Sequence, residues 1–261
     1  MNEMNKFNKP SRSMIWIIGI LGVIFLGVVL SCGLLFGVLN NYNDVHAPER
    51  LYDENGSYRF NLETISEDIL GGKEISYEEI EFKIGFELPV DYTNVMVLSE
   101  KEIMYIVRSF FNHHWQEDVD DWALQQITYR AFNCEEGMSG MVYAIYKFQK
   151  YHEDTGKLII RSISIQSWDG TIDWREYAEI EYGAYHEIAI NNYDYSATQA
   201  LALVDQNSGR EILQDPKETC EEIQIKTYSG NNPEWTVRYV FSATKSIYFD
   251  VNARTGKVNK R

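Results

Sequence analysis

The sequence feature that most constrains the fold is a repeated order of one helix followed by three strands. The first copy opens at Ser99, with Glu102 three positions later, which is the signature of a helix capping box. Apolar residues then recur at helical spacing. Three stretches in which apolar and polar residues alternate come next, a pattern typical of strands. They cover residues 124–132, 141–149 and 158–166.

The second copy opens at Ser196, with Gln199 at the same offset. It is again followed by three strand patterns, at residues 222–228, 235–241 and 247–251. Short turns between such strands favour antiparallel pairing, with the helix covering one face. The sequence therefore predicts an α+β fold with two tandem units, each a helix packed on a curled antiparallel sheet of three or four strands.

An apolar run without a charged residue covers residues 14–39. Roughly 20 apolar helical residues span a bilayer, so the run predicts a transmembrane helix in contact with the lipid bilayer. Lys6, Lys9 and Arg12 precede it, which places the N-terminus in the cytoplasm and the rest of the chain outside. The expected anchor includes Met14, Trp16, Phe25, Leu35 and Leu39.

Two other interpretations of this run remain open. A cleaved signal peptide normally has an apolar region of roughly 7–15 residues, which is shorter than this run. A lipoprotein signal would use Cys32, which follows Val29, Leu30 and Ser31, as the lipidated residue. All three interpretations place the main body outside the cytoplasm, and the transmembrane helix and the lipoprotein signal would both hold it at the cell membrane.

These patterns divide the chain into six parts. From the N-terminus these are a cytoplasmic tail (1–13), a transmembrane helix (14–39), a juxtamembrane spacer with a strand pattern (40–92), a first α+β unit (93–167), a tyrosine-rich connector (168–192) and a second α+β unit (193–261).

Charge and cysteine content restrict the function. The formal net charge is −15, so nucleic acid is not an expected partner, because phosphates would be repelled. Of the three cysteines, Cys32 lies in the apolar run. Cys134 and Cys220 could form a disulfide that closes a long loop, or could remain two buried thiols.

The second unit resembles a known module. The residues that carry the likeness are a helix with Ala197, Ala200, Leu201 and Val204, then Trp235, Val237 and Tyr239, then Asp250, Ala253, Thr255, Gly256, Lys257 and Val258. Together they resemble the PepSY-type module of bacterial secreted and membrane-anchored proteins. The resemblance implies a cystatin-like fold and a role in binding or regulating a partner, such as a peptidase or a cell-wall enzyme. The layout is also similar to that of cell-wall-elongation regulator proteins.

Residues that could carry catalysis or bind a metal have structural explanations. His113 and His114 are adjacent, whereas a helical zinc pair needs i, i+4 spacing. The acidic run 116–121 lacks the spacing of a calcium loop, and Ser139 lacks a nucleophile elbow. Thr255, Gly256 and Lys257 form a structural turn, since glycine allows positive φ.

No catalytic residue, metal or cofactor is therefore expected, and the sequence predicts a non-enzymatic envelope protein that binds a protein partner. The alternatives are a structural subunit of an envelope complex and an envelope hydrolase. Tyrosines are favoured in recognition surfaces, and several crowd the connector and its flanks. The expected partner-binding residues are Tyr177, Tyr182, Tyr185, Tyr193 and Tyr195.

Overall fold

The computed structural model describes residues 50–82, 98–132, 134, 141–180, 187–209, 219–228, 232–242 and 244–261. The chain divides into two compact units, Met1–Pro48 and Glu49–Arg261. All the described residues belong to the second unit.

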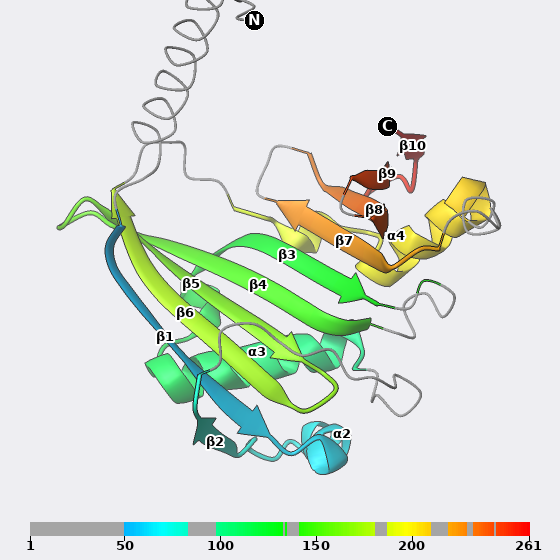
Figure 1. The fold of residues 1–261 in the computed structure, drawn as a ribbon. Helices are drawn as coiled ribbons and strands as arrows, with labels where there is room; N and C mark the ends of the chain where they lie inside the picture. Colours follow the sequence, from blue (N-terminus) through cyan, green and yellow to red (C-terminus); the bar gives the residue numbers. More distant parts are fainter. Residues whose placement is uncertain are drawn as a thin grey trace, which may run out of the picture. The chain divides into compact units, whose positions relative to one another are not determined.

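The described part of this unit is built on one ten-stranded sheet in which every neighbouring pair is antiparallel. The strand order is β10-β9-β8-β7-β3-β4-β5-β6-β1-β2 (Figure 1). The strands are β1 Arg50–Phe60, β2 Tyr77–Ile80, β3 Ala123–Ala131, β4 Met141–His152, β5 Lys157–Gln166, β6 Thr171–Ile180, β7 Glu222–Tyr228, β8 Glu234–Ser242, β9 Lys245–Asn252 and β10 Val258–Lys260.

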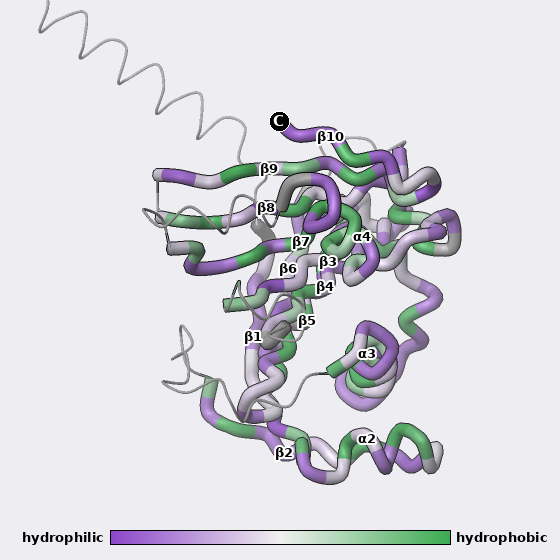
Figure 2. The backbone as a smooth tube through the Cα atoms, turned by 90° about the vertical axis from the view of Figure 1, so that its right-hand side faces the viewer, coloured by the Kyte–Doolittle hydropathy of each residue, from purple (hydrophilic) through white to green (hydrophobic). Residues whose placement is uncertain are grey.

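The three α-helices of the described segments lie on the same side of this sheet (Figure 2). They are α2 Leu62–Leu70, α3 Glu100–Trp115 and α4 Ala197–Val204, and α4 continues into a π-helical segment, Asp205–Gly209. Short 3₁₀ turns occur at Val119–Asp121 and Ile190–Asn192. The opposite side of the sheet is called the open face below.

Both predicted helix starts are confirmed. Ser99 and Glu102 form a full capping box at the start of α3, and Ser196 and Gln199 do the same for α4. In each box the serine hydroxyl accepts from the backbone amide of the third helical residue. The first orphan amides of both helices are thereby satisfied.

The core lies between the helices and the sheet. Strand β8 shows the alternation plainly, because Trp235, Val237 and Tyr239 are at most 1% exposed, while the residues between them are half-buried. From α3, Phe110 and Phe111 are fully buried against the same side of the sheet. Alternation in a strand places every second side chain on the open face, where the polar residues of β8 lie.

The predicted fold class, with two separate cystatin-like units, is wrong. β3 and β7 pair along their length, from Gln126 opposite Tyr228 to Ala131 opposite Ile223. This ladder joins the strands that follow α3 to those that follow α4 in a single sheet. The backbone amides and carbonyls that would form two exposed edges are paired instead.

Several strands of this sheet were not expected from local patterns. β1 lies within the predicted spacer and pairs with both β6 and β2. β6 lies within residues 168–192, the predicted connector. Residues 83–88 of the strand pattern expected in the spacer lie outside the described residues.

The expected membrane-spanning helix is not found in the part of the chain that the structure describes. Within the described ranges, no helix combines the length and the apolar character needed to cross a membrane. Residues 14–39, which hold Met14, Trp16, Phe25, Leu35 and Leu39, lie outside those ranges. This finding contradicts the predictions of a single-pass protein of the cell membrane and of contact with the lipid bilayer. Cys32, the alternative lipoprotein anchor, also lies outside the described residues.

Candidate binding pocket on the open face of β7, β8 and β9

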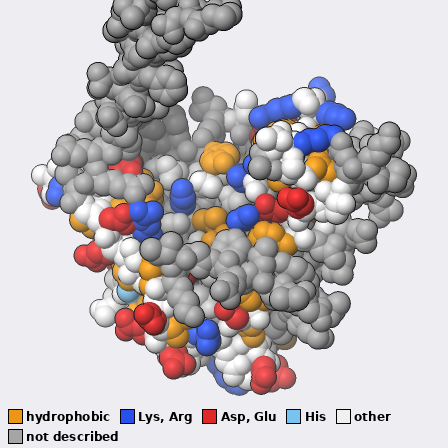
Figure 3. Space-filling model, in the orientation of Figure 1, with side chains coloured by type: hydrophobic (Ala, Val, Ile, Leu, Met, Phe, Trp, Pro, Cys, Tyr) orange, Lys and Arg blue, Asp and Glu red, His pale blue; other side chains and the backbone are white. Residues whose placement is uncertain are grey.

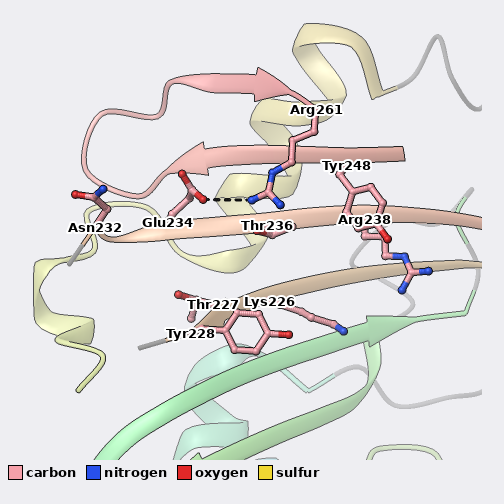
Figure 4. A pocket seen from close by; sticks show the side chains of 9 residues that line it. All are labelled: Lys226, Thr227, Tyr228, Asn232, Glu234, Thr236, Arg238, Tyr248 and Arg261. Atoms are coloured by element: carbon pink, nitrogen blue, oxygen red, sulfur yellow. Dashed lines mark ion pairs between the residues drawn. The ribbon is translucent and has the colours of Figure 1, made fainter. Parts of the chain in front are cut away.

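A pocket of about 450 Å³ opens on the open face of β7, β8 and β9. Its lining is polar and aromatic, with three cationic side chains and one carboxylate: Lys226, Thr227, Tyr228, Asn232, Glu234, Thr236, Arg238, Tyr248 and Arg261 (Figure 4). In the space-filling view, Lys and Arg side chains gather over the area where Figure 1 places β8 to β10 (Figure 3).

Strand register brings the lining together. Lys226 of β7 lies opposite Thr236 of β8, and Gln224 lies opposite Arg238. On the other side of β8, Arg238 lies opposite Tyr248 of β9. Because side chains alternate along a strand, the residues between them point into the core, and Lys226, Thr236, Arg238 and Tyr248 share the open face.

At one end of the pocket the charges are compensated. Arg261 forms an ion pair with Asp250 and lies 3.7 Å from Glu234. The hydroxyl of Thr236 donates to Asp250 across 3.1 Å. Burial, together with the nearby charge of Asp250, raises the pKa of Glu234, and Arg261 opposes that rise.

At the other end the cations have no such compensation. Arg238 donates from Nε to the Ser246 hydroxyl at 3.0 Å, and its guanidinium carbon lies 5.3 Å from the centre of the Tyr248 ring. Among the described residues, no carboxylate forms an ion pair with Arg238 or Lys226. Burial lowers the pKa of Lys226, and the charges of Arg238 and Arg130 lower it further.

Arg130 of β3 lies beside this end but is engaged elsewhere. It forms an ion pair with Glu222, whose other carboxylate oxygen accepts from Gln224. Glu222 is therefore committed to Arg130 and Gln224, although its charge also acts on Lys226. The uncompensated pair of cations is Lys226 and Arg238. Such a pair, backed by hydroxyl and aromatic groups, can hold an anionic group by charge-assisted hydrogen bonds.

The tyrosines expected to bind a partner lie in different places. Tyr177 is on β6 and is buried, with the Arg175 guanidinium 5.5 Å from its ring centre. The Tyr193 hydroxyl lies 2.7 Å from that of Thr227, and its ring lies 5.5 Å from that of Trp235. Tyr182 and Tyr185 lie outside the described residues. Their partner-binding role stays a prediction.

Tyr195 explains the glycine of the C-terminal turn. Gly256 has φ of +69°, and a β-carbon added there would lie 3.0 Å from Cζ of the Tyr195 ring. The side chain of Asn252 accepts from the amides of Arg254 and Thr255, so the turn is closed by its own residues. The turn at Thr255, Gly256 and Lys257 is therefore explained by contacts within the protein, without a ligand.

The cysteines and the histidine pair that the sequence singled out have structural contacts. A disulfide joins Cys134 and Cys220. His114 packs against Trp174, with ring centres 4.1 Å apart, and accepts or donates at 3.3 Å with the Tyr58 hydroxyl. Within the described ranges, no group of three or more His, Cys, Asp or Glu side chains could hold a metal ion.

In the acidic run, Glu117 pairs with Arg161 at 3.0 Å and Asp120 pairs with Arg108 at 2.8 Å. These carboxylates are therefore engaged within the protein. Ser139 lies outside the described residues.

Sequence reasoning missed Lys226 and Arg238. Both stand at the polar positions of strand patterns that were read only for their buried residues. The available signal was the alternation itself, since Thr236 and Arg238 fall between Trp235, Val237 and Tyr239. What the sequence did not show was that β7 and β8 pair in the register that sets Lys226 beside Arg238.

Comparisons with known proteins place this chain in no family. The sequence matches no protein-family model, and no curated protein matches it. Among solved structures it is similar to full-length peroxisomal multifunctional enzyme type 2 from Drosophila melanogaster, at 10% identity and a TM-score of 0.19. The match covers 89% of this chain and 51% of that one, so the chain spans about half of that protein's length. A likeness this slight carries no argument about fold or function.

Proposed function

We propose that this chain is a non-enzymatic binding module that recognises a partner protein through the pocket on β7, β8 and β9 and regulates it. One observation carries the proposal. Lys226 and Arg238 lie side by side in a pocket of a chain whose net charge is −15, and no described carboxylate pairs with them. Two adjacent cations repel each other, and a ligand that fills the pocket would relieve that repulsion.

The resemblance to PepSY-type modules supports the same proposal. All of the pocket lining falls within residues 193–261, the part of the chain that carries the likeness. The partner that this resemblance suggests is a peptidase or a cell-wall enzyme. We propose that the partner is regulated when part of it occupies the pocket. Strand pairing and the contacts of Arg238 with Ser246 and Tyr248 already orient the lining, which reduces the cost of ordering it on binding.

Site-specific photo-crosslinking in cells that express the full chain tests this function. A benzophenone amino acid replaces Tyr228, which lines the pocket and is 54% exposed, or Tyr151, which is 40% exposed on the β4–β5 hairpin. We expect a discrete covalent adduct with one protein from position 228 and none from position 151.

Two tryptophan substitutions test whether the adduct depends on the open volume of the pocket. Thr236→Trp fills the pocket without changing its charge, and Thr155→Trp adds the same bulk at the exposed turn after β4. The adduct from position 228 should disappear with the first substitution and persist with the second. Equal adducts from both crosslinking positions, or an adduct that survives Thr236→Trp in a folded protein, would overturn the proposed function.

A further inference from the structure

Resting on the proposed function, we infer that the group held in the pocket is a carboxylate of an acidic peptide segment, bound between Lys226 and Arg238. Three features of the pocket favour a carboxylate: the position of the two cations, their available donor atoms, and the charge of the other lining residues.

The two cations are positioned to converge. Lys226 lies opposite Thr236, and Arg238 is two residues further along β8, so the two are diagonal neighbours. Diagonal neighbours on adjacent strands are ~7–8 Å apart, within reach of long side chains. Figure 4 shows the Lys226 amine and the Arg238 guanidinium at the same end of the pocket. A carboxylate between them can contact both.

Their donors are available in the described structure. Arg238 uses Nε for Ser246 and lies over the ring of Tyr248, contacts that orient the guanidinium and leave its two terminal nitrogens for a ligand. The planar fork of those nitrogens matches the two oxygens of a carboxylate. Lys226 adds a compact ammonium charge from the neighbouring strand.

The charge distribution favours a short acidic segment over a long polyanion. At the far end of the pocket two carboxylates, Glu234 and Asp250, share the single cation Arg261, so that end keeps a formal negative charge and would repel further carboxylates. The whole chain is strongly acidic, so a polyanion much longer than the pocket would be repelled by the surface beyond the lining, whereas a short acidic peptide would not reach that surface. One or two carboxylates of the ligand can enter the pocket. The rest of the ligand then stays outside it, beside the exposed side chain of Tyr228.

Binding of a defined peptide tests the inference. Fluorescein-labelled hexaglutamate and hexaglutamine are titrated with the full chain, and fluorescence anisotropy is recorded. We expect hexaglutamate to bind at least tenfold more tightly than hexaglutamine. The double variant Lys226→Met with Arg238→Met should lose at least about a hundredfold in affinity, because each of its two lost charge-assisted contacts is worth at least about tenfold.

The matched control removes the same charges elsewhere. Lys101→Met with Arg108→Met takes one lysine and one arginine from exposed positions of α3, on the other side of the sheet, and should change the affinity less than twofold. Thermal unfolding verifies that both doubles fold. If the pocket double does not fold, the single Lys226→Gln variant takes its place and should weaken binding about tenfold.

The inference would be overturned if the two peptides bound equally, or if the pocket variant kept the affinity of the wild type. It would also be overturned if a labelled phosphoserine peptide bound more tightly than hexaglutamate and inorganic phosphate displaced it. The proposed function is judged separately. If Thr236→Trp removes the cellular adduct while Lys226→Met with Arg238→Met leaves it intact, the partner binds in the pocket but not through a carboxylate.

Discussion

At the residue scale, Lys226 combines a structural cost with a proposed function. Burial and the charges of Arg238 and Arg130 lower its pKa, so the folded protein holds this proton less tightly than the unfolded chain does. At neutral pH Lys226 is charged in both states. Its burial and the neighbouring cations make that charge less favourable in the folded state, which lowers the free energy of unfolding. The contribution of Lys226 to the free energy of unfolding rises with pH only between its lowered pKa in the folded protein and the ordinary value near 10.5. In that range the unfolded chain holds the proton and the folded protein does not.

We therefore expect Lys226→Met to stabilise the fold at pH 7 while it weakens hexaglutamate binding. The free energy of unfolding, measured in urea from pH 7 to 10.5, should be higher than that of the wild type at pH 7. The difference should shrink as the pH rises and Lys226 of the wild type loses its proton. Lys101→Met is the control, with a stability within about 0.5 kcal/mol of the wild type. A Lys226→Met protein less stable than the wild type at pH 7 would contradict this account of the site.

At the scale of elements, Glu100 connects the two helix-and-strand groups. It lies in the first turn of α3, yet its carboxylate accepts from the amide of Thr198 at 2.8 Å and from the Thr198 hydroxyl at 2.6 Å, in the first turn of α4. The amide of Ala197 donates to it at 3.3 Å. A negative group at this point satisfies orphan amides and complements the helix dipole.

Glu100→Ala should lower the free energy of unfolding by about 0.5–2 kcal/mol, the usual cost of losing a helix cap. Because Glu100 also lies in the first turn of its own helix, Glu63→Ala is the matched control. Glu63 occupies the same part of α2, and its loss should cost about 0.3–1 kcal/mol. Equal costs in urea denaturation would show that the contact with α4 contributes nothing.

Elements also show what local sequence patterns could predict. The capping boxes at Ser99 and Ser196 were found because a cap is a contact between residues three positions apart. Strands β3, β4, β5, β7, β8 and β9 were found because alternation is equally local. β6 was missed because Glu176 interrupts the alternation of apolar residues at Ile172, Trp174 and Ala178, and because its second partner, β1, is distant in the sequence. The site was missed because the adjacency of Lys226 and Arg238 depends on the β7–β8 register, which local alternation does not specify.

At the scale of the whole unit, β3 and β7 form the junction between strands that follow α3 and strands that follow α4. The disulfide stands at one end of this junction, because Cys134 follows β3 and Cys220 precedes β7. The bridge closes a loop with a sequence separation of 86 residues. A covalent tie across a long loop restricts the unfolded chain, and here it also holds the paired ends of two central strands together.

Replacing both cysteines, Cys134→Ser with Cys220→Ser, should lower the free energy of unfolding by up to about 4–5 kcal/mol in the chain-entropy model. Differential scanning calorimetry should still show one transition for residues 49–261 within the full chain, because the β3–β7 ladder keeps the sheet continuous. Two separated transitions in the wild type would indicate two independent units and would contradict the single sheet.

The central claim is that the open face of β7, β8 and β9 is the binding surface of this continuous sheet. Hydrogen–deuterium exchange of the full chain, measured with and without saturating hexaglutamate, tests it most directly, since a bound ligand suppresses local opening of the strands it contacts. The account predicts slower exchange in segments from β7, β8 and β9 and unchanged exchange in β4 and β5. Slower exchange confined to β4 and β5, or none in β7 to β9 with the peptide bound, would contradict it.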